Sequence, residues 1–181
     1  MTPTATRTAT PSSTAQLCQE RADLLETLQA HRAFLRFTVR GLTDDQARQR
    51  TTASELTLGG LVKHVTATEA QWADFIVEGA AAMAGAFQDE QAWAGGFTMG
   101  AEETLAGLLA GYDAVAARTD ELVRMLPDLD ASQELPPAPW FEPGKRNSAR
   151  RVLLHIVAET SQHAGHADIL RESLDGQKTM G

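Results

Sequence analysis

The sequence has a single cysteine, Cys18, among its 181 residues. This excludes an intramolecular disulfide and any metal site built from cysteines alone. The chain also lacks an apolar run of the roughly 18 residues that a membrane helix needs, and its start lacks the charged-then-apolar pattern of a signal peptide. We therefore expect a cytoplasmic protein that does not contact membranes.

Basic residues are also scarce, with 16 Lys and Arg against 24 Asp and Glu and a formal net charge of −8. A nucleic-acid binder needs a basic face that replaces the counterions of the phosphates, so this balance excludes that class. Hydrophobic residues make up 43% of the chain, which is enough to build the core of one domain. We expect residues 15–178 to form that domain. Residues 1–14, mostly Thr, Pro, Ser and Ala, should be a weakly ordered tail.

Apolar residues recur at helical spacing in four long segments, and we find neither strand-like alternation nor an internal repeat. Helices are expected at about 15–40, 57–78, 102–125 and 148–176. A short helix should follow Thr43, whose hydroxyl can cap it. Long connections follow the second and third long helices. This pattern predicts an all-α fold, an antiparallel four-helix bundle.

The fourth expected helix carries polar side chains on the face that should point into the bundle. At about 100° per residue, Glu159, His163 and His166 fall on the same side as the apolar residues Val152 and Leu170. An unpaired buried charge is very costly, and a divalent metal ion is the simplest compensation. Glu159 and His163 are spaced i, i+4, so both side chains can reach one ion.

A third ligand should come from another helix, because bundle cores bind metals through side chains on facing helices. His64 is the best candidate, since it shares a stripe with Leu61 and Trp72 in the second expected helix. Two histidines and one carboxylate would leave one coordination position open, as in catalytic zinc sites. These ligand types suit zinc, nickel, iron or manganese.

Each of these residues also has an alternative interpretation. Glu159 and His163 could form a buried ion pair, and His64 could be a hydrogen-bonded core histidine. His166 could be a fourth ligand, a partner that orients His163, or an acid/base beside the open position. A structural role is expected for the two remaining histidines, His31 and His155.

Four basic residues lie at or just before the start of the fourth helix, where the helix macrodipole disfavours cations. They could bind an anionic group of a thiol or substrate, or pair with acidic neighbours. Just upstream, a proline-rich loop carries two aromatic residues that could wall a pocket. The basic residues are Lys145, Arg146, Arg150 and Arg151, and the aromatic residues are Trp140 and Phe141.

The stretch from Gly79 to Gly100 is the longest irregular segment of the chain, and it carries three large aromatic side chains. These residues could support a homodimer interface or cap the bundle. They are Phe87, Trp93 and Phe97.

Two segments carry the most specific patterns, LTLGGLVKHV in the second expected helix and LLHIVAETSQHAGHADILRESLDG in the fourth. They resemble the DinB-like superfamily. Together with GLTDDQAR, which starts at Gly41, they are similar to its actinobacterial branch of small mycothiol-linked proteins.

The resemblance implies a four-helix bundle with a metal triad formed by His64, Glu159 and His163. Many members of the superfamily have histidine where this chain has Glu159. The metal domain of mycothiol-dependent maleylpyruvate isomerases is similar to this chain in using glutamate. The substitution keeps three ligands and adds one negative charge.

The resemblance also implies chemistry with a low-molecular-weight thiol such as mycothiol, in transfer to or isomerisation of an electrophilic substrate. Nothing near Cys18 suggests an activated thiolate, so the thiol must come from outside the chain. A bound metal, zinc before nickel, would lower the pKa of this thiol and hold the thiolate as a nucleophile.

Two alternative functions stay open. One is a hydrolase in which the metal activates water, with His166 or Glu69 as the general base. The other is a non-catalytic helical binding or stress-response module whose site is vestigial or structural.

Overall fold

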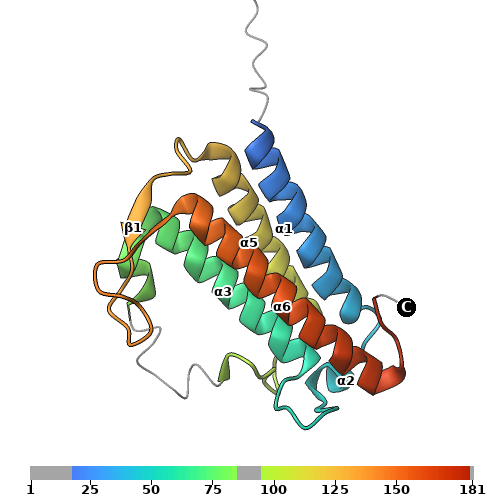
Figure 1. Ribbon diagram of the computed structural model, residues 1–181. Coiled ribbons are helices and arrows are strands. Elements are labelled where there is room, and N and C mark those ends of the chain that lie inside the picture. The colour runs from blue at the N-terminus through green and yellow to red at the C-terminus, as the bar shows by residue number, and fades with distance from the viewer. Residues whose placement is uncertain (1–17, 85–94, 180–181) are drawn as a thin grey trace, which may run out of the picture.

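Four long helices lie side by side in the computed structural model, which describes residues 18–84 and 95–179 (Figure 1). Each overlaps a segment expected to be helical, which confirms the four-helix bundle. None of the helices in the described ranges combines the length and apolar character needed to cross a membrane. The helices are α1 (Gln19–Thr38), α3 (Leu58–Glu78), α5 (Leu105–Met125) and α6 (Ala149–Asp175).

The helices form two pairs that run in opposite directions (Figure 1). Helices α1 and α6 run the same way: Arg150 at the start of α6 pairs with Glu20 at the start of α1. Near the other end, Arg171 of α6 donates a hydrogen bond of 2.8 Å to the carbonyl of Thr38. Helices α3 and α5 run together in the opposite sense (Figure 1). The neighbours α3 and α6 are therefore antiparallel.

Hydroxyl side chains fix where three of the long helices begin. Those of Thr57, Thr104 and Ser148 accept hydrogen bonds from backbone N–H groups in the first turns of α3, α5 and α6. The short helix α2 (Asp44–Arg48) follows the cap expected from Thr43, where both halves of a capping box are present. The predicted starts of α3 and α6 agree with the structure to about one residue, whereas those of α1 and α5 were a few residues too early.

The connection between α5 and α6 contains a small hairpin that the sequence did not reveal. Its strands are β1 (Ser132–Glu134) and β2 (Arg146–Ser148), which pair antiparallel. The expectation of a chain without strands is wrong here, because strands of three residues are too short to show alternation. A 3₁₀ helix, η1 (Gly79–Met83), also follows α3 within the stretch expected to be irregular. The predicted tail at 1–14 and the aromatic residues Phe87 and Trp93 lie outside the described residues.

Two apolar clusters fill the bundle, and a buried polar layer separates them. Each long helix contributes one residue to this layer. The buried apolar residues before that residue belong to one cluster, and those after it belong to the other. The layer contains Arg32 of α1, Glu69 of α3, Asp120 of α5 and Thr160 of α6.

Three members of this layer form a closed ion-pair network. The side chains of Arg32 and Glu69 are only 6% and 1% exposed. The Nε atom of Arg32 donates to Oε2 of Glu69 at 3.2 Å, and its Nη1 atom donates to Oδ1 of Asp120 at 2.7 Å. Because Nη2 of Arg32 also donates to Glu69, the carboxylate is bound at both oxygens. Every charge in this network has a partner within the protein.

We predict that Glu69→Ala lowers the free energy of unfolding by about 3–5 kcal/mol, because it leaves the buried Arg32 guanidinium without its two-point partner. Chemical denaturation measures the change. Asp74→Ala is the matched control on the same helix, since it removes the partner of Arg118 in an exposed pair worth about 1 kcal/mol or less. Equal losses in the two variants would contradict this account of the network.

Candidate metal centre

Helices α3 and α6 bring the three predicted metal ligands together. One ligand atom from each of His64, Glu159 and His163 lies within 4.8 Å of the other two. The rings of His64 and His163 meet edge to face with their centroids 4.7 Å apart. On α6 the i, i+4 spacing places Nε2 of His163 3.6 Å from Oε2 of Glu159. The triad expected from the sequence is therefore one cluster in space.

The cluster differs from the ion-pair network in the polar layer because Glu159 and His163 do not form a direct hydrogen bond with each other. A separation of 3.6 Å between His163 and Glu159 is longer than a direct hydrogen bond. Oε1 of Glu159 lies at a similar 3.7 Å from Nε2 of His155. The Glu159 carboxylate thus lies between two imidazoles and is within direct hydrogen-bond distance of neither.

The electrostatics set both kinds of ligand in the protonation state that a metal needs. The pKa of His64 lies at about 4 instead of its ordinary 6.5, mainly because the side chain is buried; the neighbouring His163 acts in the same direction and Glu159 opposes the change. The contact with His163 is the main reason that the pKa of Glu159 also lies below its ordinary value. At neutral pH His64 is neutral and Glu159 is ionised. Metal ligands bind in these forms, so the donor set fits a divalent ion.

His166 lies beside the cluster rather than within it. Its Nδ1 atom is 3.4 Å from Nδ1 of His163, and the two rings are 5.4 Å apart. Among the alternatives from the sequence, this position fits a partner that orients His163 or a nearby acid/base group.

His155 was expected to be structural, yet it contacts the predicted ligand Glu159. Its ring also meets that of Trp72 edge to face at 4.7 Å. Burial lowers the pKa of His155, and the positive charge of Arg151 acts in the same direction. The signal available in the sequence was the spacing i, i+4 from His155 to Glu159. The remaining histidine, His31, contacts Phe34 on α1, and its structural interpretation stays a prediction.

Phe97 packs against two of the predicted ligands, a position that the sequence did not indicate. Its ring stacks on the His64 imidazole with a centroid distance of 3.9 Å and an angle of 19° between the planes. It also lies 6.1 Å from the ring of His163. The sequence offered Phe97 only as a bundle cap or dimer contact, because residue spacing along one helix says nothing about a connecting segment.

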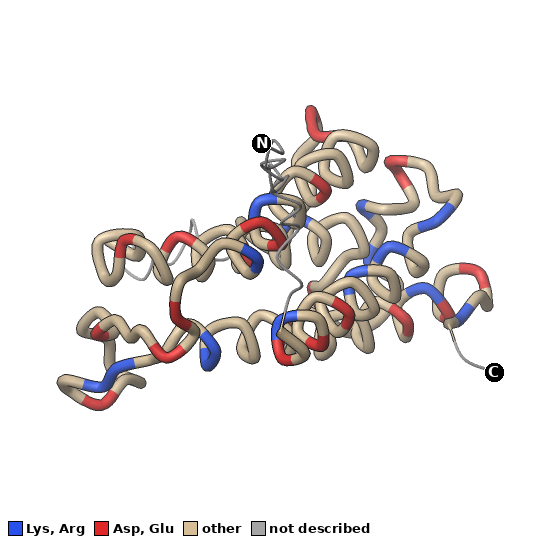
Figure 2. The backbone as a smooth tube through the Cα atoms, turned by 90° about the horizontal axis from the view of Figure 1, so that it is seen from above, with Lys and Arg blue, Asp and Glu red and all other residues tan. Residues whose placement is uncertain are grey.

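The predicted thiol-binding or substrate-binding residues fall in different places. Arg150 is not brought to the cluster: it pairs with Glu20 of α1 and with Asp130. Acidic and basic residues intermingle in the same way along the rest of the described chain (Figure 2). Arg151 lies one turn before His155 and is exposed. Trp140 is 62% exposed in the loop and meets Phe141 edge to face.

A groove in the described part of the chain lies away from the cluster. It has a volume of about 810 Å³ and lies where the end of α1 meets the start of α5. Its lining includes Phe37, Leu42 and Leu109 but no histidine. The site is therefore identified by its donor atoms and not by the size of a cavity.

We predict that the metal-free protein loses stability as the pH falls from about 6.5 towards 4. Unfolded His64 takes up a proton near its ordinary pKa of 6.5, whereas the folded form resists protonation until about pH 4. The unfolded state therefore binds more protons in this window, and the free energy of unfolding decreases with falling pH. Denaturation at a series of pH values measures the slope. His64→Gln should flatten it and His31→Gln should not; an unchanged slope in His64→Gln would contradict the shift.

Comparison with known proteins supports the same fold and assigns a family. The family model described as mycothiol-S-transferase matches residues 23–176. No curated protein matches the chain. Two solved structures share the fold. The first is YfiT from Bacillus subtilis, described as a probable metal-dependent hydrolase with an unusual four-helix bundle topology. It is 17% identical, with a TM-score of 0.61, covering 88% of this chain and 90% of that one.

The second similar structure is a conserved protein from Enterococcus faecalis. It is 14% identical, with a TM-score of 0.60, and the match covers 89% of this chain and all of the other, 100%. At these identities the two structures establish the fold alone. The family match spans most of the chain, from the first turns of α1 to the end of α6. The chain therefore belongs to the mycothiol-S-transferase family, within the DinB-like superfamily.

Proposed function

We propose that this protein is a metal-dependent S-transferase or isomerase that uses an external low-molecular-weight thiol of the mycothiol type. The observation that carries the proposal is the convergence of His64, Glu159 and His163 within 4.8 Å, in a chain of this family. The donor set favours zinc, with nickel as the second candidate.

A divalent ion held by these three side chains would bind the sulfur of an incoming thiol and lower its pKa, so that the thiolate is available at neutral pH. The chain's own thiol is not suited to this role. Cys18 is exposed and precedes α1, whereas the cluster lies between α3 and α6. The nucleophilic sulfur is therefore supplied from solution.

The protein's residues divide the remaining work. The thiol proton passes to a base, and we assign this role to His166, which lies beside the ligand His163 and can accept a proton at a ring nitrogen. In a transfer, the sulfur then forms a bond to the electrophilic carbon of the substrate, and the leaving group departs with its electron pair. In an isomerisation no group leaves: the thiolate adds to a double bond of the substrate, the substrate rotates about the resulting single bond, and the bond to sulfur breaks so that the double bond and the thiolate are restored. Glu159 contributes a negative charge that a third histidine would not.

A metal-dependent hydrolase is the second candidate, because the similar YfiT protein is described as a probable enzyme of that kind. Of the two bases considered for it, Glu69 is unsuitable: it is 1% exposed and bound at both oxygens by Arg32. His166 is then the remaining candidate base. A non-catalytic module is the third interpretation, and failure to bind metal would support it.

We predict that the zinc-loaded protein transfers mycothiol to a generic electrophile such as a chloro-dinitrobenzene. His163→Ala should lower the rate of this transfer by about 100-fold or more, because it removes a metal ligand. The rate is measured as thioether formation above the uncatalysed background. His31→Ala is the matched control, a histidine on α1 outside the cluster.

The outcomes separate the candidates. A rate that is indifferent to His163→Ala would contradict the proposal. Turnover of an ester or amide panel without any thiol, abolished by the same substitution, would favour the hydrolase. Neither activity together with no zinc binding would favour the module.

A further inference from the structure

The start of α3 carries a pair of glycines whose role is visible only in the structure. A Cβ atom placed on Gly60 would lie 1.8 Å from the carbonyl oxygen of Phe97, which no side chain can tolerate. At the neighbouring Gly59 the closest atom would be Sδ of Met99 at 2.5 Å, the end of a flexible side chain. Gly60 is therefore the position at which the backbone of another segment rests directly on the helix.

That segment is firmly attached just beyond Phe97. The guanidinium of Arg48 donates to the carbonyls of Gly100 and Ala101 at 3.2 and 3.1 Å. Lys63 reaches the carbonyl of Thr98 at 3.3 Å. Met99 is buried, at 4% exposure, and further hydrogen bonds join Glu103 to Lys63 and to the N–H of Gly100. Helices α2 and α3 thus hold the backbone that carries Phe97 in one place.

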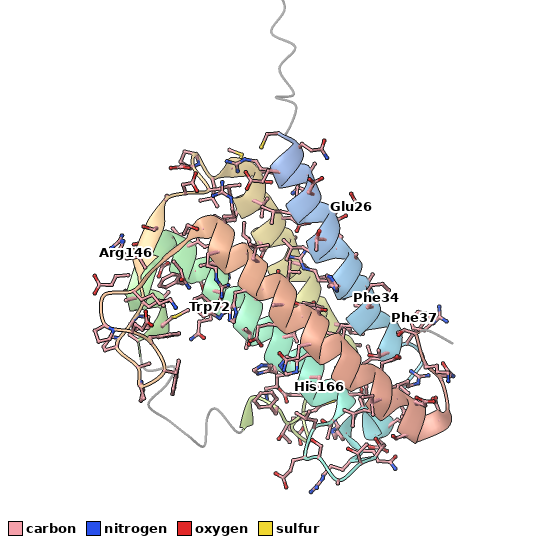
Figure 3. All side chains as sticks on the ribbon, viewed as in Figure 1. Glu26, Phe34, Phe37, Trp72, Arg146 and His166 are labelled. Atoms are coloured by element: carbon pink, nitrogen blue, oxygen red, sulfur yellow. The ribbon has the colours of Figure 1, made fainter. Side chains whose placement is uncertain are left out.

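The consequence is felt at His64, one turn along α3 from Gly60. With its backbone seated, Phe97 lays its ring on one face of the His64 imidazole at 3.9 Å and nearly parallel to it. A ring packed in this way has fewer orientations available. A ligand held in place before binding loses less freedom when it binds, which raises affinity. Figure 3 labels His166, which lies on α6 next to the ring of His163.

We propose that Gly60 and Phe97 are positioning residues for the metal ligand His64. Because Gly60 has no side chain, the backbone at Phe97 can pack directly against α3. The Phe97 ring is then held against the His64 imidazole and restricts its orientation. The part of this inference that concerns metal affinity rests on the proposed function. The packing of Phe97 against Gly60 and His64 does not rest on the proposed function, because it can be detected in the metal-free chain.

The first arm of the test uses NMR on the full metal-free chain. A stacked ring shifts the ring protons of His64 upfield, and Phe97→Ala removes that shift. Gly60→Ala should remove it as well, because the added methyl displaces the segment. Gly111→Ala is the matched control, since a Cβ atom there meets nothing within 4 Å. Wild-type shifts in Gly60→Ala would overturn the inference even if zinc binds normally.

The second arm measures zinc affinity by competition with a chelating dye. Gly60→Ala and Phe97→Ala should each weaken binding by about 10–100-fold, the usual effect of removing a residue that orients a ligand. The double variant should be no weaker than either one, because both act through the same contact. Phe97→Tyr, which keeps the ring, should retain wild-type affinity.

The two arms fail separately. Additive losses in the double variant, or unchanged affinity in Phe97→Ala, would overturn the positioning role while leaving the metal site intact. Absence of zinc binding by the wild type would overturn the proposed function and the affinity part of this inference. The ring shifts alone then decide whether Gly60 seats Phe97.

Discussion

The structure depends on how polar side chains inside the bundle are compensated. Charges in an apolar interior are very costly unless they are paired. Arg32 and Glu69 meet this constraint through short contacts with each other, and Asp120 completes their network. Glu159 and His163 lie at the same level of the bundle, beside Thr160, but remain 3.6 Å apart. One network is closed and the other is open, and the open one has the donor atoms of a metal site.

The direction of the helices explains why the open network can include an aromatic residue from a loop. Helices α3 and α5 run in the same direction, so both start at the same end of the bundle (Figure 1). The described segment just before α5 lies against the start of α3, where Gly60 leaves space for its backbone and Phe97 covers one face of His64. A topology with a short hairpin between these helices would leave that face of the imidazole without this cover. The segment before α5 thus leads into that helix and also contributes Phe97 to the site.

Helical phase within single segments was enough to predict the bundle and the pair Glu159 and His163. His64 was selected by its stripe on α3, and the structure places it against His163. The hairpin at β1 and β2 was missed, because three-residue strands carry no period. Phe97 could not be assigned, since its position depends on contacts between distant segments. The surroundings of Glu69 were hidden for the same reason: its partner Arg32 lies on a different helix.

The central claim is that one divalent ion binds to His64, Glu159 and His163, and anomalous diffraction tests it most directly. Data collected at the zinc absorption edge from zinc-loaded crystals should show one strong peak between α3 and α6. The account predicts bonds of about 2.0–2.2 Å from that peak to one ring nitrogen of each histidine and to a carboxylate oxygen of Glu159. A peak bound by other residues, or no peak at a cluster that is otherwise intact, would contradict it.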